Sequence, residues 1–232
     1  MAEDPAALQR LLEKFQDKNW EPGFDSYREH LARLNGIIKK SGAKLEGNLF
    51  YYHETPVIPD TPDPRRRNKR RNFAFYVATG KTFLEIGFNA GHSCLLALSV
   101  NPALSYEGID IGRNAYTEPC FEYLKSAFGA RVELTIADAR TVLPGLRAAG
   151  KKYDRIHVDG GHDLAVAESN LMHAIELIGP GGVILFDCGL GDGVYEPFVA
   201  LVDYHCARGD VSRVTLDRMW PGVGNVLLKV NR

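Results

Sequence analysis

Two hydrophobic patterns follow one another along the chain and meet near residue 80. Between residues 25 and 41, apolar side chains recur every three or four positions, which predicts an amphipathic helix that ends at Gly42. An earlier helix is predicted to begin at Asp4 and Pro5. Residues 47–64 contain four prolines and cannot form a regular helix, so they are a packed connector or a lid over a site.

Beyond Lys81 short apolar runs alternate with helical segments. Strands are predicted at residues 82–87, 105–112, 131–139, 153–161, 183–189, 212–216 and 225–230. Helices are predicted at residues 92–100, 117–129, 164–182 and 197–209, and the third of them is expected to end in a Gly-Pro-Gly-Gly turn. This order predicts the α/β class, with a doubly wound, mostly parallel, seven-stranded sheet and an N-terminal helical extension.

The strand patterns also predict positions within the sheet. Alternating apolar residues at 132, 134 and 136 suit a half-covered edge strand, whereas the continuous apolar run at 183–187 suits a central strand buried on both faces. We therefore divide the chain into a helical preface with a lid-like loop at 1–80 and a catalytic domain at 81–232.

Composition narrows the classes of function. The chain has 232 residues, 45% of them hydrophobic and 25% charged, which is ordinary for a globular domain. A formal charge of −1 argues against a general nucleic-acid binder. The chain has no apolar run of about 18 residues and no secretory signal pattern, and its four cysteines show no CxxC spacing; we therefore expect no membrane span and a cytoplasmic location.

A glycine turn after the first predicted strand, and acids after four others, point to the chemistry. The turn reads G-F-N-A-G and lacks both the central glycine of a dinucleotide fingerprint and the lysine of a P-loop. Asp110, Asp138, Asp159 and Asp187 each fall at a predicted strand end. Since ligands of such sheets bind beyond the carboxyl ends of the strands, four acids there suit a ligand with hydroxyls, an amine and a positive centre.

These residues resemble a known family. The pattern E-I-G-x-x-x-G-x-S at residues 85–93 is similar to the first motif of class I S-adenosylmethionine-dependent methyltransferases of the catechol O-methyltransferase-like branch. The D-G-x-H pattern at 159–162 and the P-G-G turn before Asp187 resemble macrolide-sugar O-methyltransferases of the methyltransferase 24-like family. The resemblance covers roughly residues 80–230 and leaves the preface unassigned.

The resemblance implies an S-adenosyl-L-methionine site. Glu85 would orient the loop or meet the cofactor ammonium, Ser93 would meet its carboxylate, and Asp110 would bind both ribose hydroxyls. Asp138, followed by Ala139, would accept from the adenine amino group, and Asp159 would lie near the sulfonium. The remaining implied cofactor contacts are Gly87, Phe88, Asn89, Gly91 and Ile111.

Two devices could remove the proton of a hydroxyl acceptor. Asp159 and Asp187 could hold Mg²⁺, which lowers the pKa of a bound oxygen, or His162 could act as general base beside Asp159. Metal-dependent relatives usually follow the second aspartate with Asp or Asn, whereas this chain has Cys188, a poor ligand for a hard cation; Asp192 is an alternative ligand.

Less specific interpretations stay open. Asp138 could cap a helix, His162 could have no chemical role, and His157 suits a core histidine with its hydrogen bonds satisfied. Residues 65–71 contain six basic side chains, which suit a solvated helix face or an acidic small substrate better than RNA. The competing functions are therefore a small-molecule O-methyltransferase, an RNA-modifying enzyme and a cofactor-binding protein with altered chemistry. A homo-oligomer is left open, because the preface can pack on its own domain or on a second copy.

Overall fold

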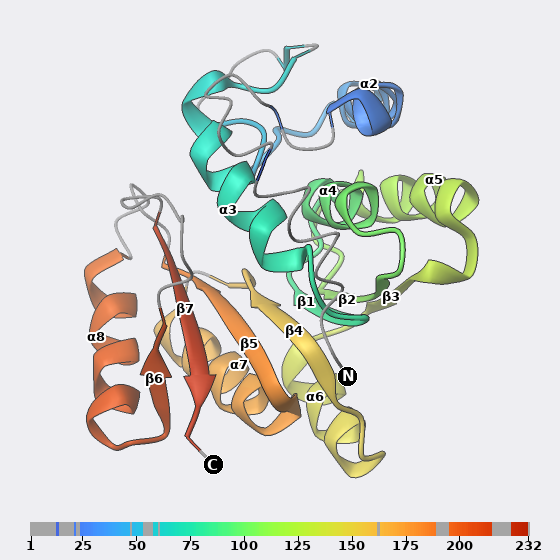
Figure 1. Ribbon diagram of the computed structural model, residues 1–232. Helices are drawn as coiled ribbons and strands as arrows, with labels where there is room; N and C mark the ends of the chain where they lie inside the picture. The colour runs from blue at the N-terminus through green and yellow to red at the C-terminus, as the bar shows by residue number, and fades with distance from the viewer. Residues whose placement is uncertain are drawn as a thin grey trace. The chain divides into compact units, whose positions relative to one another are not determined.

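The computed structural model describes residues 13, 21, 24–46, 48–52, 58–59, 61–161, 163–188, 195–214 and 224–231. Its helices are α2 (Phe24–Ser41), α3 (Arg67–Val77), α4 (His92–Val100), α5 (Thr117–Phe128), α6 (Ala139–Ala148), α7 (Leu164–Leu177) and α8 (Tyr195–Ala207). Its strands are β1 (Thr82–Ile86), β2 (Ser105–Asp110), β3 (Val132–Ile136), β4 (Tyr153–Val158), β5 (Ile178–Asp187), β6 (Val211–Arg213) and β7 (Asn225–Val230), all shown in Figure 1. Short 3₁₀ helices lie at Pro64–Arg66 and Gly129–Arg131.

The seven strands form one sheet in the order β3-β2-β1-β4-β5-β7-β6. Strand β4 pairs in parallel with β1 and with β5, and the late strand β7 runs antiparallel to both β5 and β6. The predicted fold class is thereby confirmed. Strand β3 lies at an edge, and β5 lies between two neighbours, as the hydrophobic patterns predicted.

Two local predictions were wrong or incomplete. The Gly-Pro-Gly-Gly segment does not end a helix but lies near the start of β5, because α7 already ends at Leu177. Helix α6 was foreseen only as a helix that Asp138 could cap, and its range was not predicted; Pro144 lies inside it. Asp138 begins that helix by accepting a hydrogen bond from the Arg140 amide with its side chain.

Chain contacts define two compact units. The first contains residues 1–80, 88–106 and 112–133, and the second contains residues 81–87, 107–111 and 134–232. Within the first unit, α2 and α3 both pack against α4, so the described part of the preface shares a core with the segment after the glycine turn. Within the second unit, α7 packs on β4 and β5 over buried residues that include Ile156, Leu171 and Ile184.

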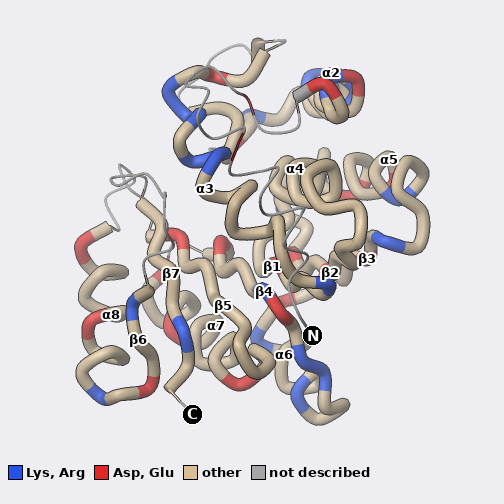
Figure 2. The backbone as a smooth tube through the Cα atoms, in the orientation of Figure 1, with Lys and Arg blue, Asp and Glu red and all other residues tan. Residues whose placement is uncertain are grey.

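The basic run at residues 65–71 is only partly a solvated helix face. Arg65 is exposed, and the guanidinium groups of Arg65 and Arg66 lie over the Tyr52 ring. By contrast, Arg70 and Arg71 are buried. Figure 2 shows Lys and Arg positions in blue along α3. The Arg70 guanidinium forms a fork on the Glu21 carboxylate and donates to the carbonyl oxygens of Leu49 and Asp63. Arg70 therefore holds together three segments of the first unit.

None of the described helices combines the length and the apolar composition required to cross a membrane.

Candidate active site

Backbone hydrogen bonds join the ends of four strands in the second unit. The Gly87 amide donates to the Ile109 carbonyl at 2.8 Å, and the Asp159 amide donates to the Ile86 carbonyl at 2.9 Å. The Ala137 amide donates to the Asp110 carbonyl at 2.8 Å. These bonds fix the chain just beyond β1, β2, β3 and β4, where a ligand of a parallel sheet is expected.

Gly87 occupies a position that no other residue fits. Its φ is +102°, and a Cβ atom placed on it would lie 2.5 Å from the Asp159 carbonyl oxygen. The missing side chain lets the end of β1 pass directly beside the end of β4. The positive φ and the contact with Asp159 each require glycine at this position.

Four polar side chains of the second unit fall on one face of the sheet. Glu85 on β1 is the register partner of His157 on β4, and His157 is the partner of Leu185 on β5. Side chains alternate between faces along a strand, so Asp159 and Asp187, two residues further along, share the face of His157 and Leu185. Register thus brings an imidazole and three carboxylates together.

The distances show how close these groups are. Nδ1 of His157 lies 2.7 Å from Oε1 of Glu85, and both side chains are fully buried. Nε2 of His157 lies 3.9 Å from Oδ2 of Asp159. His157, Asp159 and Asp187 each offer one ligand atom within 4.8 Å of the others, with Asp159 exposed and the other two buried.

The electrostatics of this cluster favour positive charge. Burial lowers the pKa of His157, but the hydrogen bond to Glu85 and the negative charges of three nearby carboxylates outweigh burial and raise that pKa. A region that stabilises an imidazolium is also a region that attracts cations.

The other predicted residues of the second unit lie at strand ends. Asp110 is the last residue of β2 and is partly buried, and the next side chain, Ile111, is 58% exposed. Asp138 forms an ion pair with Arg140 at 2.6 Å in addition to its capping bond. The hydrogen bond from Arg140 holds the pKa of Asp138 below its usual range. The helix-capping interpretation of Asp138 is therefore observed, and Ala139 is the first residue of α6.

The remaining predicted cofactor residues belong to the first unit. Gly91 has a φ of +73°, and a Cβ there would lie 2.5 Å from the Phe88 ring. Asn89, at a φ of +52°, accepts a hydrogen bond from the Tyr116 hydroxyl at 2.7 Å. Ser93 is buried in the first turn of α4.

His92, beside Ser93, uses its ring for packing. The imidazole lies against the rings of Phe50 and Tyr51, with centroid separations of 5.4 and 5.8 Å. Complete burial lowers the pKa of His92 to about 3, so the ring is neutral. The His92 ring therefore packs against the preface within the first unit.

Two predicted residues lie outside the described part of the chain. These are the candidate base His162 and the alternative ligand Asp192. Cys188 is described: it is buried directly after Asp187, and its amide donates to the Gly224 carbonyl at 2.7 Å.

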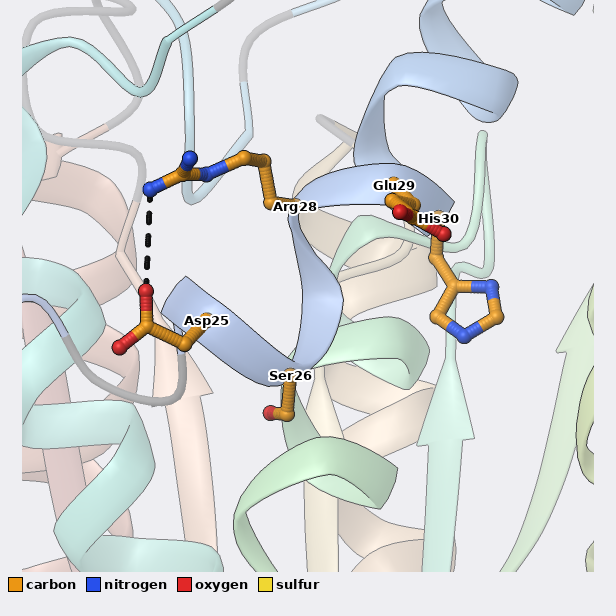
Figure 3. Close-up of a pocket in the computed structure, with 5 residues that line it drawn as sticks. All are labelled: Asp25, Ser26, Arg28, Glu29 and His30. Atoms are coloured by element: carbon orange, nitrogen blue, oxygen red, sulfur yellow. Dashed lines mark ion pairs between the residues drawn. The ribbon is translucent and has the colours of Figure 1, made fainter.

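A hollow on α2 contains none of the predicted site residues. It has a volume of about 250 Å³ and is lined by Asp25, Ser26, Arg28, Glu29 and His30 (Figure 3). All five side chains come from the first two turns of one helix, and Arg28 pairs with Asp25 at 3.7 Å. We assign no function to it.

His157 was interpreted from the sequence as a core histidine with its hydrogen bonds satisfied, and its ring is fully buried and bonded to Glu85. The position of two aspartates beside this ring was not foreseen. The available signal was the spacing of His157 and Asp159, which are two positions apart and therefore face the same side of a strand. The pairing with Glu85 required the register of β1 and β4, which the sequence alone does not specify.

Comparisons with known proteins agree with the geometry. A family model described as a methyltransferase domain matches residues 84–187. A caffeoyl-CoA O-methyltransferase from Stellaria longipes is 29% identical over 126 residues, which are 53% of this chain and 52% of that protein. The chain thus spans about half the length of that relative.

Solved structures show the same fold. The O-methyltransferase TomG from Streptomyces achromogenes, in complex with SAM, has a TM-score of 0.63 at 19% identity, covering 88% of this chain and 90% of TomG. The SAH-bound methyltransferase PaMTH1 from Podospora anserina has a TM-score of 0.62 at 15% identity, covering 100% and 98%. Residues 84–187 are therefore similar to a methyltransferase domain, and the fold of the chain is that of solved methyltransferases.

Proposed function

We propose that the chain transfers the methyl group of S-adenosylmethionine to a hydroxyl oxygen of a small-molecule acceptor. The observation that carries this proposal is the arrangement of strand ends in the second unit. There the Gly87 backbone lies directly against the Asp159 backbone, and Asp110 and Ile111 lie at the end of the adjacent strand β2. The named activities of the relatives, a caffeoyl-CoA O-methyltransferase and the O-methyltransferase TomG, support transfer to oxygen.

The residues present suit the parts of this cofactor. The Asp110 carboxylate can accept hydrogen bonds from two adjacent ribose hydroxyls, and exposed Ile111 offers an apolar surface to adenine. Asp138, followed by Ala139, is proposed to accept a hydrogen bond from the adenine amino group. The Asp138 carboxylate would then bind both this amino group and Arg140. Gly87 would let the chain approach the methionine part closely. We also propose that Phe88, Asn89, Gly91 and Ser93 contact it, as the family resemblance implies.

The cofactor, when bound, supplies an activated methyl group for in-line displacement. The contribution of the protein is to orient the acceptor oxygen at about 3 Å from that methyl and to accept its proton. We propose that Asp159 lies beside the reacting centre. We propose that the acceptor proton is removed by His162 as general base, with the help of a divalent metal at Asp159 and Asp187, or by both. The metal is included because the oxygens of these two aspartates lie within 4.8 Å of each other.

The RNA-modifying alternative is less well supported. It depended on six basic side chains between residues 65 and 71, and two of these, Arg70 and Arg71, are buried. A protein that binds RNA through phosphate contacts loses affinity steeply as salt rises. A flat salt response in an RNA-binding assay would agree with a small-molecule acceptor.

The test is a methyl-transfer assay with isotopically labelled S-adenosylmethionine and a panel of phenolic, catecholic and sugar hydroxyl acceptors, each with and without a divalent cation. We expect labelled product from at least one class of hydroxyl acceptor, and none from the Asp110→Ala variant at low cofactor concentration. Cofactor binding without transfer to any acceptor would favour a cofactor-binding protein with altered chemistry.

A further inference from the structure

We propose that His157 is a metal ligand, so that the ion held with Asp159 and Asp187 is a first-row transition metal rather than Mg²⁺. This inference rests on the proposed function only in placing a metal near the acceptor. Its evidence is the geometry of four side chains on, or directly after, the neighbouring strands β1, β4 and β5, all within the second unit. Figure 1 shows these three strands.

The first step is the orientation of the imidazole. With Nδ1 of His157 2.7 Å from a Glu85 carboxylate oxygen, the proton of a neutral ring resides on Nδ1. The lone pair then resides on Nε2, which is the nitrogen nearer to Asp159. A carboxylate that accepts from one ring nitrogen while the other ligates an ion is the usual outer support of a metal-bound histidine.

The second step is the position of Nε2. It lies 3.9 Å from Oδ2 of Asp159, which is too long for a hydrogen bond and short enough for one ion to contact both atoms after a small adjustment. An oxygen of Asp187 completes a set of ligand atoms within 4.8 Å of one another. The set opens toward solvent at Asp159, which is exposed, so an acceptor oxygen can reach it.

The third step is charge. With Glu85, Asp159 and Asp187 ionised, the cluster carries a net charge of −3 when His157 is neutral and −2 when it is protonated. Glu85 is fully buried and Asp187 is 8% exposed, so water screens this charge poorly. A divalent cation offsets it, because buried carboxylates are tolerated when they are paired or coordinate a metal.

The fourth step is the choice of ion. Two carboxylate oxygens and one imidazole nitrogen form a mixed donor set. Mg²⁺ prefers oxygen ligands only, whereas Mn²⁺, Fe²⁺, Co²⁺ and Zn²⁺ accept imidazole as well. Cys188 is not part of the set, whose third ligand comes from β4.

The test uses Mn²⁺ as the probe and the full chain without any acceptor. Electron paramagnetic resonance of free Mn²⁺ measures stoichiometry and affinity, and pulsed measurements on bound Mn²⁺ detect a directly coordinated imidazole nitrogen. We expect one Mn²⁺ per chain with such a nitrogen. The nitrogen signal should disappear in His157→Asn and persist in His162→Gln and in the control His173→Gln, which removes a partly buried histidine on α7.

Affinities give a second readout. We expect the Mn²⁺ dissociation constant to rise by about 10- to 100-fold in Glu85→Gln, which keeps a hydrogen-bond acceptor for Nδ1 but removes its charge. Mg²⁺ should bind to the wild type more weakly than Mn²⁺ does. The Mg²⁺ dissociation constant should change little in His157→Asn. Circular dichroism shows whether His157→Asn folds. If it does not fold, the wild-type nitrogen signal and its persistence in His162→Gln still decide whether an imidazole other than that of His162 coordinates Mn²⁺.

The outcomes separate this inference from the proposed function. Mn²⁺ bound without a coordinated nitrogen, a signal lost in His162→Gln instead, or no Mn²⁺ binding would overturn the inference. S-adenosylhomocysteine binding and methyl transfer are measured independently. Their absence beside an intact nitrogen signal would overturn the proposed function and leave the metal site standing.

Discussion

His157 and Glu85 form a buried pair in which the imidazole Nδ1 lies 2.7 Å from a carboxylate oxygen. They are register partners on adjacent parallel strands, so the pair is a direct consequence of how β1 and β4 align. The same register places Asp159 beside the pair and Gly87 against the Asp159 carbonyl. The conformation of the glycine turn and the position of the acids are therefore two results of one strand pairing.

Replacing Gly87 with alanine should destabilise the second unit. The new Cβ would collide with backbone at 2.5 Å and would also sit at a φ of +102°. The control Gly181→Ala has a positive φ of +74° but nothing within 4 Å, so it isolates backbone strain. We expect Gly87→Ala to lower the free energy of unfolding by about 1–3 kcal/mol more than Gly181→Ala, measured by urea denaturation. Equal effects would show that the close approach to Asp159 is absent.

Removing Arg70 should destabilise the first unit. Its guanidinium is fully buried and pairs with Glu21 while donating to the carbonyls of Leu49 and Asp63. Loss of one partner of a buried ion pair typically costs about 3–5 kcal/mol, so Arg70→Ala should lower the free energy of unfolding by that amount. Arg65→Ala, at an exposed position, should change it by less than about 1 kcal/mol. If both changes have similarly small effects on the free energy of unfolding, the whole basic run is a solvent-exposed helix face.

His92 should make stability depend on pH. Its folded pKa of about 3 lies below the unfolded value near 6.5, so the unfolded chain binds more protons between these values. Stability from this residue is complete above pH 6.5 and falls by about 1.4 kcal/mol for each pH unit below it.

The variant His92→Phe keeps an aromatic ring against Phe50 and Tyr51 and cannot titrate. Between pH 4 and 6, its plot of unfolding free energy against pH should be shallower than that of the wild type by about this amount. The variant His173→Gln serves as a control for the loss of a histidine elsewhere. Parallel slopes for wild type and His92→Phe would mean that the ring is solvated.

Asp110→Ala should weaken cofactor binding. A carboxylate that accepts two ribose hydroxyls makes charge-assisted hydrogen bonds worth about 1.5–3 kcal/mol each, so the loss should reach a few kcal/mol. Calorimetric titration with S-adenosylhomocysteine measures it, and Asp203→Ala, which removes a surface carboxylate paired with Arg213, is the matched control. Unchanged affinity in Asp110→Ala would place the cofactor elsewhere.

The sequence predicted the sheet better than it predicted the site. A strand was found within each predicted range, although residues 215 and 216 of the sixth range lie outside the described part of the chain. Helix α6 was foreseen only through its possible cap at Asp138, and the Gly-Pro-Gly-Gly segment was assigned to a helix end because glycine and proline are common there.

The site needed information that a linear pattern does not contain. Strand ends could be located from the sequence, so Asp110, Asp159 and Asp187 were identified as candidates. The pairing of Glu85 with His157 depends on the register between strands 72 residues apart. The burial of Arg70 likewise depends on Glu21 and two carbonyl groups that are distant in sequence. The local charge pattern alone therefore misjudged Arg70, and it could not reveal the partner of His157.

The most direct test of the central claim is a calorimetric titration of the full chain with S-adenosylhomocysteine, with and without a divalent cation. We predict one site per chain with a micromolar dissociation constant. An added effect of the cation would support a metal at Asp159 and Asp187 over His162 acting alone. The absence of binding under both conditions would contradict the assignment of the Gly87 turn and Asp110 to the cofactor.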